Sequence, residues 1–292
     1  MIHMNRFKEH FRYIALMLAV ICVSVLSTAD TGFGLAVDAN TEPTGCRDII
    51  KDGFTGVLTD AKAASGSAAS GSSVSVKPLK SLYKDTPATT VIDVKNRTKK
   101  EKKTMFYVKK IDDDTWKSMK GKSYHKGCPV KRRELRRVRI LYVGFDKKTH
   151  IGELITNKKI AAVCRDIFKK LYFKNYELKR VQPIDAYDGD DEASMEANNT
   201  SCFNHRVVAG SSTLSKHAYG MALDINPRHN PYVIKSTGYV SPKNGKKFAN
   251  RSKKFKHKIT HKDLVYKLFH KEGFFWGGDW IYTKDYQHFQ KS

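Results

Sequence analysis

An acidic residue inside an apolar run is the feature that most constrains this chain. Residues 221–225 read MALDI and are followed by Asn226 and Pro227, so the run is typical of a short buried strand, and Asp224 lies within it. An ionised carboxylate in an apolar interior costs several kcal/mol unless a cation or a metal meets it. The rest of the sequence must therefore supply a positively charged partner for Asp224.

Two histidines from distant segments are candidates for that partner. His217 lies seven residues before Asp224, an odd spacing that would point the two side chains to opposite faces of one straight strand. Gly220 lies between them and lets the chain bend, so we expect His217 at a turn that faces Asp224. His288 is the candidate third ligand. Two imidazoles and one carboxylate would leave one zinc position open for water, as in a catalytic zinc site.

Asp285, three residues before His288, completes the candidate site. A carboxylate beside such a centre can act as a general base that takes the proton of the water attacking a carbonyl group. A partner for Asp224 that needs no metal is also conceivable, because Arg206 or a lysine could supply the charge. Residue chemistry alone leaves a metal centre and a charge pair both open.

The order of these residues resembles that of a known peptidase family. Residues 215–224, SKHAYGMALD, are similar to the motif S-x-H-x-x-G-x-A-x-D. This motif marks zinc peptidases that act as D-alanyl-D-alanine carboxypeptidases, vancomycin-resistance dipeptidases or phage L-alanyl-D-glutamate endopeptidases. The segments DGDDEASMEANNTSCFNHR, INPRHNPYV and GFFWGGDWIYTKDYQHFQ look like the matching segments of its carboxypeptidase-like and endolysin-like branch. The resemblance covers about residues 132–290.

The resemblance implies a metal centre and a base. His217, Asp224 and His288 would be the ligands of Zn²⁺, and Asp285 would be the general base. Some relatives carry Glu at the position of the base, whereas the endolysin-like members carry Asp, as this chain does.

Three further residues are candidates for contacts with substrate. Arg206 matches the arginine that faces the substrate carbonyl in the family, where its fixed charge could stabilise the oxyanion. An ion pair of Arg206 with Asp190 or Asp191 is the alternative. Ser215 could hydrogen-bond substrate or simply form a turn, and Trp280 could line the cleft or belong to the core.

The reaction that these features predict is hydrolysis of a peptide bond in the stem peptide of bacterial peptidoglycan. The bond could be that between two D-alanines or that between L-alanine and D-glutamate, because both use the same zinc chemistry. The alternative is a non-catalytic cell-wall-binding protein that keeps the peptidase fold. The complete set of candidate ligands together with Asp285 favours the enzyme, which we expect to act as a monomer.

The composition is strongly basic, with 54 Lys and Arg against 29 Asp and Glu and a formal net charge of +25. Such a balance indicates a polyanionic partner, which could be nucleic acid, anionic lipid or an anionic wall polymer. Three basic residues precede the 14 apolar residues 13–26, and small residues follow them. This run is shorter than the ~20 residues of a membrane span, so residues 1–29 are predicted to be a secretory signal peptide or a signal-anchor. Export to the cell envelope favours the wall polymer over nucleic acid.

The remaining chain divides into a basic region and a folded domain. Residues 30–130 are predicted to be a low-complexity linker or a small appended module, in which TTVIDV and TMFYVKKI could pair as strands. Residues 131–292 are predicted to be the catalytic domain, of α+β class, with a small central antiparallel sheet flanked by helices. Its helices are expected over residues 158–171 and 260–273, the second one capped by Thr260. Four cysteines outside the leader contain no CxxC pair, which excludes a cysteine-rich zinc site and leaves a disulfide open.

Overall fold

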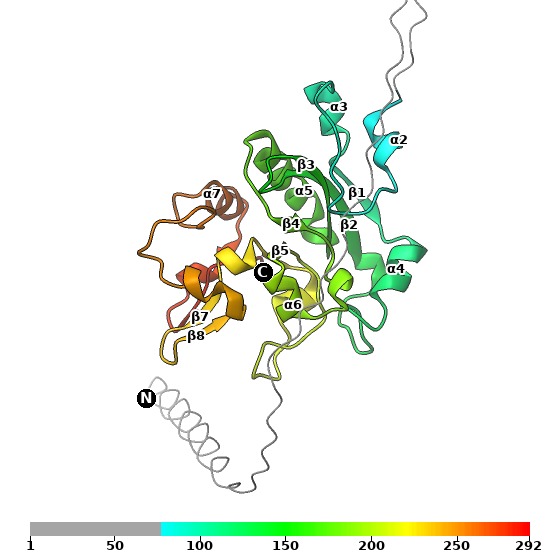
Figure 1. Ribbon diagram of the computed structural model, residues 1–292. Coiled ribbons are helices and arrows are strands. Elements are labelled where there is room, and N and C mark those ends of the chain that lie inside the picture. Colours follow the sequence, from blue (N-terminus) through cyan, green and yellow to red (C-terminus); the bar gives the residue numbers. More distant parts are fainter. Residues whose placement is uncertain (1–76) are drawn as a thin grey trace, which may run out of the picture. The chain divides into compact units, whose positions relative to one another are not determined.

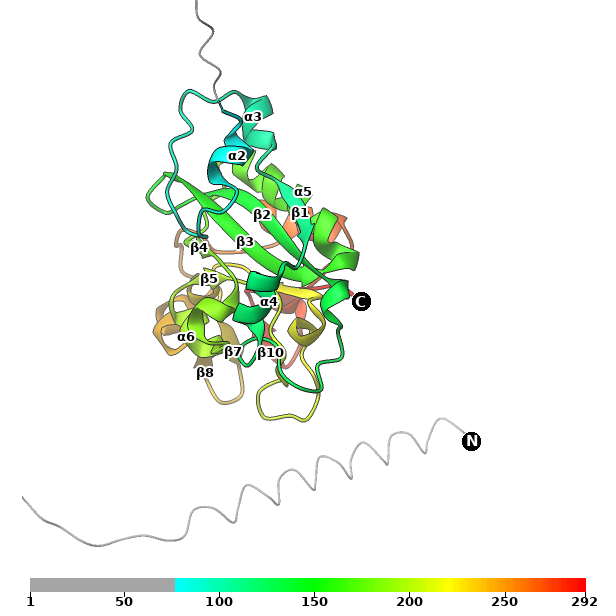
Figure 2. The same cartoon turned by 90° about the vertical axis from the view of Figure 1, so that its right-hand side faces the viewer.

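A computed structural model describes residues 77–292 of the chain. The predicted leader and residues 30–76 of the predicted linker lie outside this range. Within it the fold is α+β, as predicted, with small antiparallel sheets and few helices (Figures 1 and 2). No helix between residues 77 and 292 combines the length and the apolar character that crossing a membrane requires.

The helices and strands of the described residues are mostly short. The α-helices are α2 (Leu79–Tyr83), α3 (Lys99–Lys103), α4 (Asp113–Met119), α5 (Lys158–Phe173), α6 (Asp191–Glu196) and α7 (Leu264–Lys271). The first strands are β1 (Tyr107–Lys110), β2 (Leu135–Val143), β3 (Thr149–Asn157), β4 (Arg180–Val181) and β5 (Asn199–Thr200). The later strands are β6 (Ala222–Asp224), β7 (Tyr232–Ile234), β8 (Tyr239–Ser241), β9 (Phe275–Trp276), β10 (Thr283–Asp285) and β11 (His288–Gln290).

The long hairpin of β2 and β3 forms the centre of the fold. It is antiparallel, with Val138 opposite Leu154, and β1 adds a third strand on the β2 side. Helix α5 follows β3 directly and lies along the hairpin (Figure 1). The side chain of Asn157 caps α5 by accepting a hydrogen bond from the backbone N–H of Lys159. One apolar stripe of α5 is buried in the same core as the hairpin, as its helical spacing predicts.

The folded unit begins earlier than the sequence predicts. Strand β1 comes from TMFYVKKI in the expected linker and pairs with β2. TTVIDV does not pair with it but lies against β3, through backbone hydrogen bonds of Thr89, Thr90 and Ile92 and a bridge between Val91 and His150. Leu79, Met105 and Phe106 are buried in the same core as the hairpin. These apolar residues help to bury the hairpin. The local composition is so rich in lysine that the sequence does not indicate this role.

Two small sheets at the C-terminal side carry the candidate site. Their strand orders are β6-β11-β9 and β10-β7-β8, and all their pairings are antiparallel. Helix α7 begins later than predicted, because the side chain of Asp263 rather than Thr260 accepts the capping hydrogen bond, from Val265 N–H. Among the described cysteines, Cys128, Cys164 and Cys202 are all free thiols.

Candidate metal centre

The structure brings His217, Asp224 and His288 together. One ligand atom of each lies within 4.8 Å of those of the other two. Their relative exposures are 3%, 3% and 6%, so the group is almost fully shielded from water. The two carboxylate oxygens of Asp224 are each 3.2 Å from an imidazole nitrogen, Oδ2 from Nε2 of His217 and Oδ1 from Nδ1 of His288. The partner that Asp224 requires is therefore a pair of histidines.

Strand register and one turn produce this convergence. Strands β6 and β11 are antiparallel neighbours, and His288 stands directly opposite Asp224. His217 lies on the 3-10 helix η3 (Lys216–Tyr219), which ends at Gly220 with φ +63°. The predicted bend at Gly220 is confirmed, and it turns the chain from η3 into β6.

The hydrogen bonds behind the two imidazoles define which nitrogen of each faces the centre. Nδ1 of His217 lies 2.5 Å from the carbonyl oxygen of Cys202, which can only accept, so Nδ1 carries the proton. Nε2 of His288 lies 3.0 Å from the side-chain oxygen of Gln290 and donates to it. The unprotonated nitrogens of both rings then face each other at 3.2 Å, together with the carboxylate of Asp224.

This arrangement fits a divalent cation. Two nitrogen lone pairs and a carboxylate repel one another at such distances unless a positive charge lies between them. Backbone or amide acceptors behind metal-binding histidines are the usual device that orients them. Two imidazoles and one carboxylate are also a donor set that zinc accepts. The residues present can therefore hold a metal ion.

In the protein without metal, a proton takes the place of the cation. Burial would lower the pKa of His288, but the hydrogen bond and charge of Asp224 prevail and raise that pKa to about 8. Burial alone would likewise raise the pKa of Asp224, yet the charges and hydrogen bonds of His217 and His288 hold it well below its usual range. Metal binding must therefore displace a proton from this group.

Asp285 lies at the edge of the cluster, at the end of β10. Its side chain is half-buried, and its Oδ1 atom is buried without a hydrogen-bond partner in the described structure. Burial raises the pKa of Asp285 to about 6, and the charge of Asp224 adds to the shift. Asp285 is not one of the converging ligands. A carboxyl group with this pKa, beside but outside a metal centre, can hold and release a proton near neutral pH.

The structure shows which residues Arg206 and Ser215 contact. Arg206 forms an ion pair with Asp191, with Nη2 2.7 Å from Oδ2, and its Nε is buried without a partner. Ser215 caps η3, where its hydroxyl accepts a hydrogen bond from the backbone N–H of His217 at 3.2 Å. Ser215 thus holds the turn that carries His217.

The aromatic residues near the C-terminus have different environments. Trp280 is half-buried, and its ring centroid is 5.3 Å from that of His288, so it stands beside the metal centre. Trp276 is 6% exposed and donates its indole N–H to the carbonyl of Tyr286 at 2.9 Å. Trp276 therefore belongs to the core, while Trp280 is placed to contact a ligand.

Two residues that the sequence interpretation missed, Gln290 and Gly277, complete the site together with Asp191. Gln290 orients His288, and its position two residues further along the same strand face could have indicated this role. Asp191 is half-buried, and desolvation raises its pKa although the charge of Arg206 opposes the shift. Gly277 lets η6 (Gly277–Asp279) approach β10 closely, because a Cβ there would lie 2.7 Å from the carbonyl oxygen of Asp285. No sequence pattern marks that approach.

Replacing Gly220 by Ala should destabilise the protein through the turn behind His217. The residue has a positive φ, and an added Cβ would lie 2.7 Å from the backbone nitrogen of Asn157. We expect a loss of ~1–3 kcal/mol in the free energy of unfolding, measured by urea denaturation. Gly238→Ala is the matched control, since Gly238 has φ +70° but no atom within 4 Å of the added Cβ. Equal losses in both variants would contradict a special constraint at Gly220.

Comparison with known proteins finds a family model that matches the segment carrying this site. A family model described as D-alanyl-D-alanine carboxypeptidase matches residues 209–291, which include His217, Asp224, Asp285 and His288. The resemblance inferred from the sequence is thereby confirmed over this segment. No curated protein and no solved structure matches the chain.

Proposed function

We propose that this chain is a zinc-dependent peptidase that acts on the peptidoglycan stem peptide, because a family model described as D-alanyl-D-alanine carboxypeptidase matches residues 209–291. The single observation that carries the proposal is the convergence of His217, Asp224 and His288 with Asp285 beside them. The proposal includes export through the leader over residues 1–29, because the substrate lies outside the cell membrane. The stem peptide is the proposed partner of the monomeric enzyme.

The chain's own residues would prepare the cofactor site before substrate arrives. His217, Asp224 and His288 would hold Zn²⁺, while Cys202 and Gln290 keep the imidazoles in the required orientation. When bound, Zn²⁺ would polarise a carbonyl group and lower the pKa of a water at its open position to about 7. The burial of the three ligands strengthens their electrostatic interactions, because little water competes.

Asp285 would accept the proton of the attacking water. Its unpartnered Oδ1 has no competing hydrogen bond and is free to accept the proton of the attacking water. With a pKa of about 6, the carboxylate is mostly ionised at pH 7 and yet basic enough to take that proton. The same group could then return it to the departing amine nitrogen, as a general acid.

Arg206 would stabilise the negative charge that develops on the substrate carbonyl oxygen. The guanidinium has five N–H donors, and the ion pair with Asp191 does not use all of them. The pair instead restrains the orientation of Arg206 next to the metal centre. A restrained donor that points at developing charge costs little reorganisation during the reaction.

Mass spectrometry of the products from a defined stem pentapeptide tests the proposal and identifies the bond. With zinc supplied, we expect either loss of the terminal D-alanine or cleavage between L-alanine and D-glutamate, and no product after chelation. A pentapeptide ending in two L-alanines is the control for stereochemical selection. Binding of the pentapeptide without any product from the zinc-loaded protein would refute the peptidase proposal and favour the non-catalytic wall-binding alternative.

A further inference from the structure

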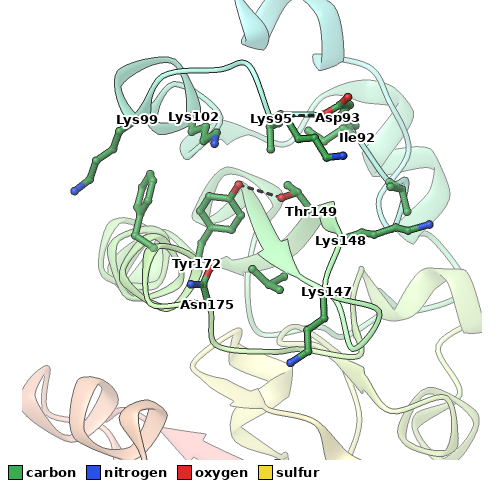
Figure 3. Close-up of a pocket in the computed structure, with 14 residues that line it drawn as sticks. Ile92, Asp93, Lys95, Lys99, Lys102, Lys147, Lys148, Thr149, Tyr172 and Asn175 are labelled. Atoms are coloured by element: carbon green, nitrogen blue, oxygen red, sulfur yellow. Dashed lines mark hydrogen bonds between the residues drawn. The ribbon is translucent and has the colours of Figure 1, made fainter.

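A cavity that shares no residue with the candidate metal centre lies at the far end of strand β3. The cavity has a volume of about 770 Å³ and opens between residues 91–102, the turn joining β2 to β3, and the C-terminal end of α5 (Figure 3). Strand β3 runs from the cavity at Thr149 to Asn157, whose N–H donates to the carbonyl of Gly220 at 2.9 Å. At ~3.3 Å per residue, the two ends of this strand are roughly 26 Å apart.

Five of the fourteen residues that line this cavity are lysines. They are Lys95, Lys99, Lys102, Lys147 and Lys148, and the only acidic lining residue is Asp93. Figure 3 shows Lys95 and Lys102 on the segment that faces the hydroxyl groups of Thr149 and Tyr172, while the side chains of Lys99, Lys147 and Lys148 extend outward at the rim. The five lysines come from two segments of chain that are about fifty residues apart, so the cluster is a product of the fold and not only of a basic run.

The positive charge of the cavity is hardly neutralised by the protein. Among residues 77–292, only Lys147 of the five makes an ion pair, with Glu177. Asp93 is engaged locally, because its Oδ1 accepts a hydrogen bond from the backbone N–H of Lys95 at 2.9 Å. Like charges gathered in this way destabilise the fold by mutual repulsion. A bound polyanion would relieve that repulsion.

The use of lysine ammonium groups as donors indicates a ligand that carries phosphate groups along a chain. Lysine ammonium groups are compact charges on flexible stems and can follow phosphates at varied positions, whereas arginine suits planar bidentate contacts. The volume is that of a drug-sized ligand, larger than one phosphate needs. Several lysines from both sides of the cavity could then contact successive phosphates of one chain.

The aromatic residues of the cavity favour a polymer without bases. Tyr172 is 7% exposed, and its hydroxyl is hydrogen-bonded to Oγ1 of Thr149 at 3.1 Å. The ring of Phe173 is covered by the ammonium of Lys99, which lies 5.5 Å from its centroid. Proteins that bind single-stranded nucleic acid without sequence preference stack bases on open aromatic faces. The buried ring of Tyr172 offers no such face, and the ammonium of Lys99 competes with a base for that of Phe173.

The geometry points to this cavity as a binding site for a phosphodiester-linked polyol chain. The contacts are salt-sensitive pairs between lysine ammonium groups and successive phosphates. The site is separate from the metal centre and does not depend on its chemistry, so it would hold the protein on a polyanionic surface whatever bond the metal centre cleaves.

Binding of soluble poly(glycerol phosphate) to the full chain, measured by calorimetry at several salt concentrations, tests this inference. The variant Lys95→Gln/Lys102→Gln/Lys148→Gln should bind about tenfold more weakly, since each exposed pair contributes modestly. The slope of log affinity against log salt concentration should also fall, by about 2, because three phosphate contacts are lost.

The matched control is Lys253→Gln/Lys254→Gln/Lys262→Gln, which removes the same charge from exposed lysines outside the cavity. It should keep most of the affinity. Equal weakening in both variants would show that only net charge matters and would overturn the site. A single-stranded oligonucleotide that binds as tightly through the same three lysines would overturn the assignment to a polymer without bases. Unchanged thermal unfolding of both variants confirms that each is folded.

Discussion

Asp285→Asn is expected to lower kcat for stem-peptide hydrolysis by about 10²–10⁴-fold, the usual contribution of a positioned general base. The amide has nearly the shape of the carboxylate but cannot accept the proton. The metal content of the purified variant should not change, because Asp285 is outside the three converging ligands. Steady-state kinetics together with metal analysis of the same sample measure both effects.

The pH profile supplies a second readout for Asp285. Burial raises its pKa to about 6, and a base must be ionised, so activity should fall as the pH drops through that pKa. A bound cation favours the carboxylate, which places the acidic limb of the profile at or below about pH 6. The residual activity of Asp285→Asn should lack this limb.

Asp279→Asn is the matched control for Asp285→Asn. Asp279 belongs to the same C-terminal segment, but its side chain is 47% exposed and pairs with His261. Its replacement should leave kcat and the acidic limb unchanged. Near-normal turnover in Asp285→Asn would mean that another group takes the proton, and the role of Asp285 would have to be abandoned.

Asp224→Asn is expected to remove most of the metal affinity. The carboxylate is the only negative charge among the three candidate ligands, and each of its oxygens faces one histidine nitrogen at 3.2 Å. Loss of a group that merely orients a ligand already costs about 10–100-fold in affinity, so loss of the ligand itself should cost more than about 100-fold. Titration with zinc against a chromogenic chelator measures this change.

Thermal unfolding distinguishes lost metal binding from a damaged fold. A metal bound only to the native state stabilises it by about 4 kcal/mol at 1,000 times Kd, so zinc should raise the Tm of the natural protein. Asp224→Asn should unfold cooperatively without metal and show little shift on adding zinc at the same concentration, whereas Asp279→Asn should shift like the natural protein. A full zinc shift in Asp224→Asn would disprove the metal centre proposed here.

The sequence was most informative where a local pattern is compatible with only one local structure or one kind of partner. An aspartate inside MALDI needs a positive partner, and a glycine between His217 and Asp224 permits the bend that the structure contains. The apolar period of residues 158–171 predicts α5 almost to its ends. The sequence indicated a strand in TMFYVKKI, but neither its pairing with β2 nor the burial of Leu79 in the same core, because the apolar residues there are too few to form a periodic pattern.

The sequence by itself determined the candidate chemistry of this protein: two imidazoles, two carboxylates and an arginine in an order that resembles that of a peptidase family. Only the tertiary structure decided their arrangement. Antiparallel pairing of β6 with β11 sets His288 opposite Asp224, and Asp191 rather than Asp190 pairs with Arg206. The lysine cavity likewise exists only because two distant segments meet at one end of the hairpin. Local patterns encode the hydrophobic period of helices and strands and the positions of turns. The register between distant strands is set when their apolar faces are buried together, and that burial requires the complete fold.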